Sequence, residues 1–427
     1  MAPSSLRCNT CDVERDDPYP FRCTNSGHDD GDHLLTRVLD PTGLTFPGAA
    51  DPNPFVRYRA LLHSYQWATA RGLTDAEWID RAGALDDAVA DVAGTRLGGT
   101  PIRRDAQLAA GVGAGDVWVK DETGQPGGSH KVRHLFGTML HLDAAAAVGA
   151  PPSAGPLAIA SCGNAALAAA VIARAVQRDL VVFVPEWADA DVVTRLRDLG
   201  AQLEVCRRRP NEPGDPCVAA FRGAVANGAV PFSCQGPDNA LALDGGRTLA
   251  WEIAGETGTV DRVFVQVGGG ALGSSVVQGL QESVALGVID RLPAIHAVQT
   301  EGGFPIVRAF ERFRSVAGSR DGATRYAAQH RSEFMWPWER EPVSIATGIL
   351  DDEVYDWLAI VQGMHESGGS PLVVDDERLR DAQQRAIETT GIRVSATGSA
   401  GLAGALSKGS AETASQSDER IVVLFTG

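Results

Sequence analysis

From Val117 onward the chain repeats one unit, in which a short apolar segment is followed by a turn of small residues and then by an alanine-rich stretch. The segment "DVWVKDE" precedes Gly127-Gly128-Ser129, "PLAIAS" precedes Cys162-Gly163-Asn164, and "DRVFVQV" precedes Gly268-Gly269-Gly270. Alternation of this kind predicts an α/β fold, with parallel strands covered by helices on both faces. Ligands in such folds bind beyond the carboxyl ends of the strands, so the glycine turns mark the expected site.

The composition narrows the class of protein. A chain of 427 residues exceeds one ordinary hydrophobic core, which predicts two or three domains. A hydrophobic fraction of 44% and a mean hydropathy of −0.08 are typical of a globular protein. The net charge of −16 argues against nucleic acid or an anionic membrane as partner and favours a small-molecule substrate. Because we find neither a signal-peptide pattern nor an apolar run of membrane-spanning length, we expect a cytoplasmic protein.

Lysine is rare in this sequence, which makes each lysine informative. Only Lys120, Lys131 and Lys408 occur, against 35 arginines. An amine can lose its proton and attack a carbonyl carbon, whereas a guanidinium stays charged and inert. Lys131 follows a glycine pair and a serine at the start of an expected helix, where a cation is unfavourable. We therefore predict that Lys131 acts covalently.

Four of the turns together offer a distinctive set of groups: the amine of Lys131, the amide of Asn164, the backbone N–H groups of residues 268–272 and the hydroxyl of Thr397. Pyridoxal phosphate needs a lysine for its aldehyde, N–H donors at a helix start for its phosphate, and polar partners for its ring oxygen and nitrogen. The set therefore predicts this cofactor.

The motifs also carry a family resemblance. "KDETGQPGGSHKVR", "ASCGNAA", "VQVGGGALGS" and "VSATGSAGLAGAL" resemble, in order and spacing, the motifs of fold-type II pyridoxal phosphate enzymes, and further stretches are similar to threonine synthases. The resemblance covers roughly residues 95–427. It implies a homodimer, and a chain with a large cofactor-binding domain (residues 41–134 and 250–427) and a smaller, mobile α/β domain (residues 135–249).

The resemblance implies roles for individual residues. Lys131 is the expected catalytic residue. The expected cofactor contacts are His130, Asn164, Gly268, Gly269, Gly270, Ala271, Leu272 and Thr397, and the expected substrate contacts are Ser129, Arg133, Ser161, Cys162 and Gly163. The pair His130-Lys131 resembles that of tryptophan synthase β-subunits. For His130, a phosphate contact and a simple packing role both remain open.

The first forty residues form a separate Cys/His-rich extension with few apolar positions, which cannot build a core alone. It resembles the short zinc-ribbon-like extension of some threonine synthases, although only one Cys-x-x-Cys knuckle is intact. The candidate zinc ligands are Cys8, Cys11 and Cys23 with His28, or with His33 in its place. Unliganded cysteines are the alternative.

These observations predict a pyridoxal phosphate-dependent lyase or synthase that performs β- or γ-elimination or replacement on a small amino acid, as threonine synthases do. The alternatives are a threonine or serine dehydratase-like ammonia-lyase and a cofactor-binding protein without catalysis. Ala165 stands where threonine synthases carry a phosphate-binding threonine, and only Arg133 could compensate. We therefore expect O-phosphohomoserine to be a poor substrate.

Overall fold

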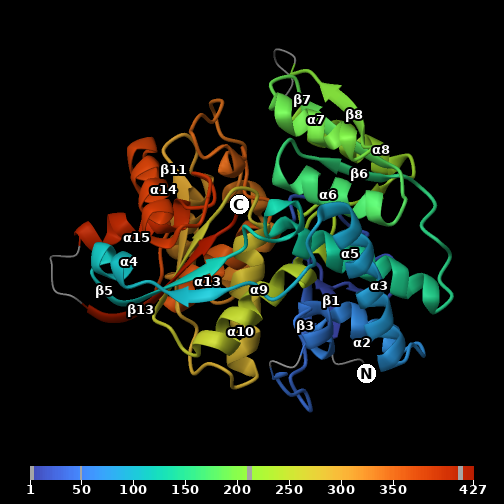
Figure 1. Ribbon diagram of the computed structural model, residues 1–427, viewed down its shortest axis with the longest axis horizontal. Helices are drawn as coiled ribbons and strands as arrows, with labels where there is room; N and C mark the ends of the chain where they lie inside the picture. The colour runs from blue at the N-terminus through green and yellow to red at the C-terminus, as the bar shows by residue number, and fades with distance from the viewer. Residues whose placement is uncertain (1–3, 49–50, 209–213, 412–416) are drawn as a thin grey trace.

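The computed structural model describes residues 4–48, 51–208, 214–411 and 417–427 (Figure 1). Its larger sheet has six strands in the order β12-β11-β10-β13-β5-β4. All neighbouring strands are parallel except the pair β4 and β5. The strands are β4 (Ile102–Arg104), β5 (Ala114–Asp121), β10 (Arg262–Gln266), β11 (Ala294–Thr300), β12 (Leu372–Val374) and β13 (Ser417–Phe425).

Helices surround this sheet. They are α4 (Ala106–Val112), α9 (Leu241–Thr257), α10 (Ala271–Ala285), α11 (Pro305–Ala317), α12 (Ala323–Gln329), α13 (Trp357–Ser367), α14 (Asp376–Thr390) and α15 (Ala400–Ala411). Strands buried between helices are largely apolar, as in the fully buried segment of β10 from Val263 to Val265.

A second sheet has four parallel strands in the order β8-β7-β6-β9. It consists of β6 (Leu157–Ala160), β7 (Leu180–Pro185), β8 (Gln202–Cys206) and β9 (Val230–Pro231), with the helices α6 (Asn164–Ala175), α7 (Ala190–Asp198) and α8 (Pro216–Ala226). In Figure 1 this green lobe stands apart from the lobe that holds the larger sheet. The predicted α/β fold with parallel sheets flanked by helices is confirmed; the exact domain boundaries stay a prediction.

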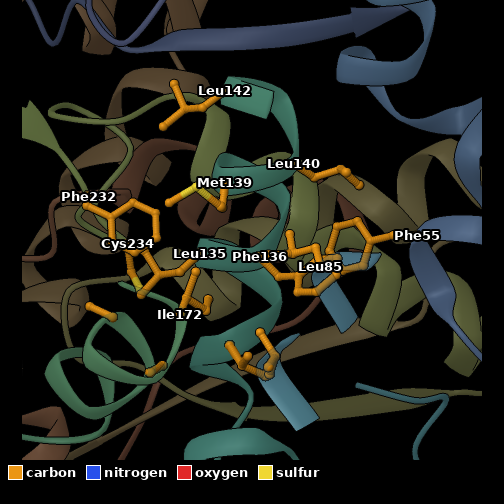
Figure 2. Close-up of a cluster of buried hydrophobic side chains, with 14 of the residues drawn as sticks. Phe55, Leu85, Leu135, Phe136, Met139, Leu140, Leu142, Ile172, Phe232 and Cys234 are labelled. Carbon is orange, nitrogen blue, oxygen red and sulfur yellow. The ribbon is translucent and has the colours of Figure 1, made fainter. Parts of the chain in front are cut away.

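Helix α5 (Lys131–Ala147) fixes the position of Lys131 because almost all of its length is buried. Figure 2 shows its apolar side chains within a cluster that also holds residues from the N-terminal helices and the smaller lobe. The rings of Phe55 and Phe136 lie 4.8 Å apart between centroids. Each large apolar side chain buried here contributes roughly 1.5–3 kcal/mol, so the helix is held firmly.

Residues 54–93 contain the helices α1 (Pro54–Arg57), α2 (His63–Thr69) and α3 (Asp75–Ala93). Thr74 caps α3: its hydroxyl accepts the Glu77 backbone N–H at 3.2 Å, and the Glu77 carboxylate accepts the Thr74 N–H at 2.8 Å. Short 3₁₀ turns lie at Arg59–Leu61, Pro126–Gly128, Arg331–Glu333 and Thr347–Ile349. None of the helices in the described ranges is long and apolar enough to cross a bilayer.

The N-terminal extension folds as a three-stranded antiparallel sheet, β2-β1-β3, formed by β1 (Ser4–Cys8), β2 (Glu14–Arg15) and β3 (Leu35–Leu39). It docks on the larger lobe at the end of α12, where the Thr10 hydroxyl and the Asp32 N–H both donate to the Ala328 carbonyl, at 3.0 and 2.7 Å. The extension, which lacks a large core of its own, is thus held against the larger lobe.

Candidate cofactor and substrate site

Lys131 is the first residue of α5, at the carboxyl end of β5. The turn before it needs two glycines, because Gly127 and Gly128 have φ angles of +77° and +81°. The buried Ser129 hydroxyl accepts the Lys131 backbone N–H at 3.4 Å. Gly127 also lies close to α6, since an added Cβ would stand 3.4 Å from the Ala168 Cα. The loop is therefore fixed against the second lobe, with the lysine at its end.

His130, directly before Lys131, is 6% exposed. Neither of its ring nitrogens has a hydrogen-bond partner within the described ranges. Burial, reinforced by Lys131, lowers the pKa of His130 well below its ordinary value, so the ring is neutral at pH 7. Buried polar atoms are rarely left unpaired, so an orphaned ring directly before Lys131 fits a ligand contact.

The loop between β10 and α10 is packed so closely that side chains cannot be added to it. A Cβ at Gly268 would lie 2.5 Å from Asp351 Oδ2, and one at Gly270, where φ is +97°, would lie 2.7 Å from Val354 Cγ1. Gly269 lies against the Tyr355 ring. Ala271 and Leu272 then start α10 and are buried. The first N–H groups of a helix have no partner within it, so this loop suits the phosphate of the predicted cofactor.

The Thr397 hydroxyl is linked to the same loop through one intermediate segment. It accepts the Gly348 backbone N–H at 3.0 Å. The Gly348 carbonyl oxygen in turn lies 3.1 Å from where a Gly268 Cβ would stand. The structure therefore brings the predicted hydroxyl and the predicted phosphate loop to one edge of the larger sheet.

The turn after β6 carries the predicted substrate contacts of residues 161–164. The Ser161 hydroxyl accepts the Gly163 N–H at 3.4 Å, and Asn164 starts α6. Burial, together with the nearby Asp351 carboxylate, raises the pKa of Cys162 to about 11. The thiol therefore stays protonated and is a poor nucleophile. Helix α6 presents its N-terminus here, a favourable environment for a substrate carboxylate.

Arg133 does not contact the substrate site, which corrects one prediction. Its guanidinium is fully buried and pairs with Glu122 at 2.7 Å and Glu252 at 2.8 Å, and Lys120 pairs with the same Glu252 at 2.6 Å. The reason is helical geometry, because two residues along α5 correspond to a rotation of about 200° away from Lys131. Arg133 anchors the helix and is unable to replace the phosphate-binding hydroxyl missing at Ala165.

Asp351 was not identified from the sequence. It is part of the irregular segment before α13 and lies against Gly268 and Gly269. Burial raises the pKa of Asp351 to about 6; the positive charge of Lys131 opposes this shift, and Asp215 on the other lobe adds to it. The pattern "GILDDE" contains no glycine turn or lysine to mark it as part of a site; its only indication was a run of three acidic residues after an apolar pair.

The Cys/His cluster lies in the N-terminal extension. Cys8, Cys11, Cys23 and His33 each offer a ligand atom, and these four atoms lie within 4.8 Å of one another. The Cys8 sulfur is 3.5 Å from His33 Nδ1, and the Asp29 carboxylate holds His33 Nε2 at 2.8 Å. His28 is exposed and lies outside this group, so of the two histidines considered only His33 is brought to the three sulfur atoms.

Comparison with known proteins agrees with this geometry. The family model described as "Pyridoxal-phosphate dependent enzyme" matches residues 95–427. A threonine synthase from Methanocaldococcus jannaschii is 27% identical over 336 residues, which cover 77% of this chain and 74% of that protein. An L-threonine ammonia-lyase from Thermotoga maritima is 27% identical over 247 residues, 57% of each chain.

Solved structures share the fold. Maize serine racemase superposes with a TM-score of 0.60 at 20% identity, covering 82% of this chain and 92% of that one. A fungal L-serine ammonia-lyase from Rhizomucor miehei gives a TM-score of 0.57 at 22% identity, with 77% and 93% covered. The predictions of the cofactor, of the fold type and of a lyase of this group are confirmed.

Proposed function

Because the chain belongs to the pyridoxal phosphate-dependent enzyme family, we propose that it is a lyase in which Lys131 holds the cofactor and moves the α-proton of a small amino acid. The observation that carries this proposal is the position of Lys131. Lys131 directly follows the buried His130, whose ring nitrogens have no partner among the described residues, and its charge opposes the rise that burial causes in the pKa of Asp351, which borders Gly268 and Gly269 of the glycine loop.

Each of the other groups has a role that its position supports. The backbone N–H groups of residues 268–272 and the neutral His130 ring would hold the phosphate, Asn164 the ring oxygen, and Thr397 the ring nitrogen. The cofactor supplies the electron sink for the carbanion at the substrate Cα. A hydroxyl does not keep the ring nitrogen protonated as an aspartate would, which suits elimination or replacement better than transamination.

On the substrate side, residues 161–164 would bind the α-carboxylate at the N-terminus of α6. The protonated Cys162 thiol adds no charge there. Lys131 Nζ then removes the α-proton, and the leaving group departs from Cβ or Cγ.

An ammonia-lyase reaction is favoured over threonine synthesis by two observations. Ala165 supplies no hydroxyl for a substrate phosphate, and Arg133 is fully engaged with Glu122 and Glu252. Without these donors a phosphorylated substrate loses charge-assisted hydrogen bonds worth roughly 1.5–3 kcal/mol each.

We also propose that Cys8, Cys11, Cys23 and His33 bind a structural zinc ion, since three thiolates and one imidazole in close proximity are a common set of zinc ligands. A homodimer remains our expectation from the family resemblance, and a cytoplasmic location remains our expectation from the sequence pattern.

The experiment that tests the function is a screen of amino acids against the purified holoenzyme, following the cofactor absorption band together with release of ammonia, phosphate and threonine. Ammonia and a keto acid from a hydroxy or amino substrate would support the lyase. Efficient conversion of O-phosphohomoserine to threonine would instead establish the synthase. A protein that binds the cofactor and turns over no amino acid would contradict both.

A further inference from the structure

One buried carboxylate ties the N-terminal extension to α13. Asp32 Oδ1 accepts the indole N–H of Trp357 at 3.2 Å and pairs with Arg331 at 3.3 Å. The Asp32 side chain is 1% exposed, and Trp357 is fully buried. A hydrogen bond between groups this deeply buried is unfavourable to lose, because water cannot replace the missing partner. The extension is therefore fixed to the first residue of α13.

The residue before Trp357 supports the glycine loop directly. The Asp356 backbone N–H donates to the Gly269 carbonyl at 3.0 Å. A Cβ at Gly270 would stand only 3.2 Å from the backbone nitrogen and the Cβ of Asp356. The peptide bond between Gly269 and Gly270 is trans, so its carbonyl and its N–H point in opposite directions. Fixing the carbonyl to Asp356 therefore turns the Gly270 N–H to the opposite side of the loop, away from α13.

The Asp356 side chain also holds the linker that returns from the smaller lobe. This linker, residues 232–240, joins β9 to α9. The fully buried Asp356 carboxylate accepts the Gly236 N–H, with distances of 3.1 and 3.2 Å to its two oxygens. The approach is so close that a Cβ at Gly236 would collide with Asp356 Oδ1. Asp356 thus joins the linker to the glycine loop.

The extension packs on the same linker. The Phe21 carbonyl accepts the Ala240 N–H at 3.0 Å, and Leu34 Cδ1 lies 2.8 Å from where a Gly236 Cβ would stand. Ala240 also belongs to the small buried cluster formed by the apolar residues of the extension. The extension therefore contacts both the linker and the start of α13, which are the two elements that meet at Asp356.

We propose that the N-terminal extension is a positioning element for the cofactor, acting through Asp32, Trp357 and Asp356 to hold the glycine loop in its phosphate-binding shape. The inference rests on the proposed function, because that function assigns the cofactor phosphate to this loop. A loop that is preorganised binds its ligand without first having to be ordered. Loss of the contact between Asp32 and Trp357 should therefore weaken the binding of pyridoxal phosphate.

The test measures the dissociation constant of pyridoxal phosphate by equilibrium dialysis against the cofactor-free full-length protein. Trp357→Phe keeps an aromatic ring and removes the indole N–H. It should raise the dissociation constant by roughly fivefold to fiftyfold, as expected when a buried acceptor loses its donor. At saturating cofactor the absorption band should stay at the wavelength of the unaltered protein, because Lys131 is untouched.

Trp78→Phe is the matched control for a purely structural effect. Trp78 is also fully buried, and its indole N–H donates to the Phe55 carbonyl at 3.0 Å, but it lies in α3. This variant removes an equivalent hydrogen bond far along the chain from the glycine loop. It should lower the unfolding midpoint of the cofactor-free protein about as much as Trp357→Phe does, and leave the dissociation constant unchanged.

A double substitution tests whether Asp32 and Trp357 act through one contact. Asp32→Ala should raise the dissociation constant by a factor similar to that of Trp357→Phe, and combining the two should add little. An unchanged dissociation constant in Trp357→Phe, an equal rise in Trp78→Phe, or fully additive effects would each overturn the inference. Trp357→Phe decides the point alone if Asp32→Ala does not fold. An unaltered protein that fails to bind pyridoxal phosphate would instead overturn the proposed function itself.

Discussion

The cofactor site and the Cys/His cluster are built in opposite ways. The site collects residues from turns after β5, β6 and β10 and from the segment around Thr397, so it depends on two sheets and on the closely packed glycine loop. The cluster draws on one segment of the chain, from the last residue of β1 to just before β3, which is held by hydrogen bonds to the end of α12. The first is preorganised by the core; the second needs an ion or a neighbouring surface to hold its ligands.

This difference decides what each region tolerates. The loops of the site keep their shape through backbone packing, so losing one functional group there should remove chemistry and leave stability largely intact. A metal ion, in contrast, supplies folding energy directly to a segment without a core of its own. Substitutions in the cofactor site should therefore change mainly activity, and substitutions in the Cys/His cluster should change mainly stability.

The largest effect is expected at Lys131. Lys131→Ala should reduce kcat by roughly a thousandfold or more, because it removes both the anchor of the cofactor and the base for the α-proton. Reduction of the holoenzyme with borohydride should fix the cofactor to the peptide that contains Lys131. The unfolding midpoint should change little. Label on Lys120 or Lys408 would exclude the assignment.

Lys131 also shows how much could be read from the sequence. The glycine turns, the rarity of lysine and the alternation of apolar segments with alanine-rich stretches predicted the fold and the cofactor, because these are local patterns. Arg133 was misassigned because its direction depends on the phase of α5 and on partners as distant as Glu252. Asp351 was missed because an irregular segment has no periodicity from which its orientation follows. His28 and His33 fit the spacing equally well, and only the folded path of the chain distinguishes them.

The second-largest expected effect is a loss of stability in the large lobe, next to the cofactor site. Arg133→Leu should destabilise the protein by about 3–5 kcal/mol, because it leaves the buried Glu122 without a cationic partner and the buried Glu252 with Lys120 alone. Urea unfolding of the cofactor-free protein measures this directly. As control, Arg81→Leu breaks the exposed pair with Asp143 and should cost less than about 1 kcal/mol. Equal costs for the two variants would contradict the anchoring role.

The same network predicts a dependence on pH. Although burial opposes it, Arg133 and Lys120 lower the pKa of Glu252 to about 2. A carboxyl whose pKa is depressed on folding stabilises the protein above its unfolded value of about 4.5 and loses that contribution as pH falls toward 2. Glu252→Gln should therefore flatten the loss of stability between these pH values. Unfolding curves of both proteins across that window provide the measurement, and parallel pH profiles would refute it.

The Cys/His cluster should respond in metal content and stability rather than in chemistry. Holoenzyme purified without chelator should carry about one zinc per chain, and Cys8→Ser or His33→Ala should lower both the zinc content and the unfolding temperature. His28→Ala is the matched control, because His28 is exposed and outside the four-residue group. Elemental analysis decides the point, and a protein that contains no zinc would rule out the site.

The smallest effect on activity is expected at Thr397. Two substitutions there distinguish the contribution of the side-chain hydroxyl from that of the rest of the residue. Thr397→Ala removes the acceptor of the Gly348 N–H and the proposed partner of the ring nitrogen, which should lower kcat by roughly threefold to tenfold. Thr397→Ser keeps the hydroxyl and should stay close to the unaltered enzyme. Steady-state rates together with the cofactor absorption band provide the measurement, since a purely structural role would lower cofactor content while the bound fraction kept its rate. If both variants lost activity equally, the methyl group that packs near Gly348 would be the important feature, and the hydroxyl would have no part in tuning the cofactor.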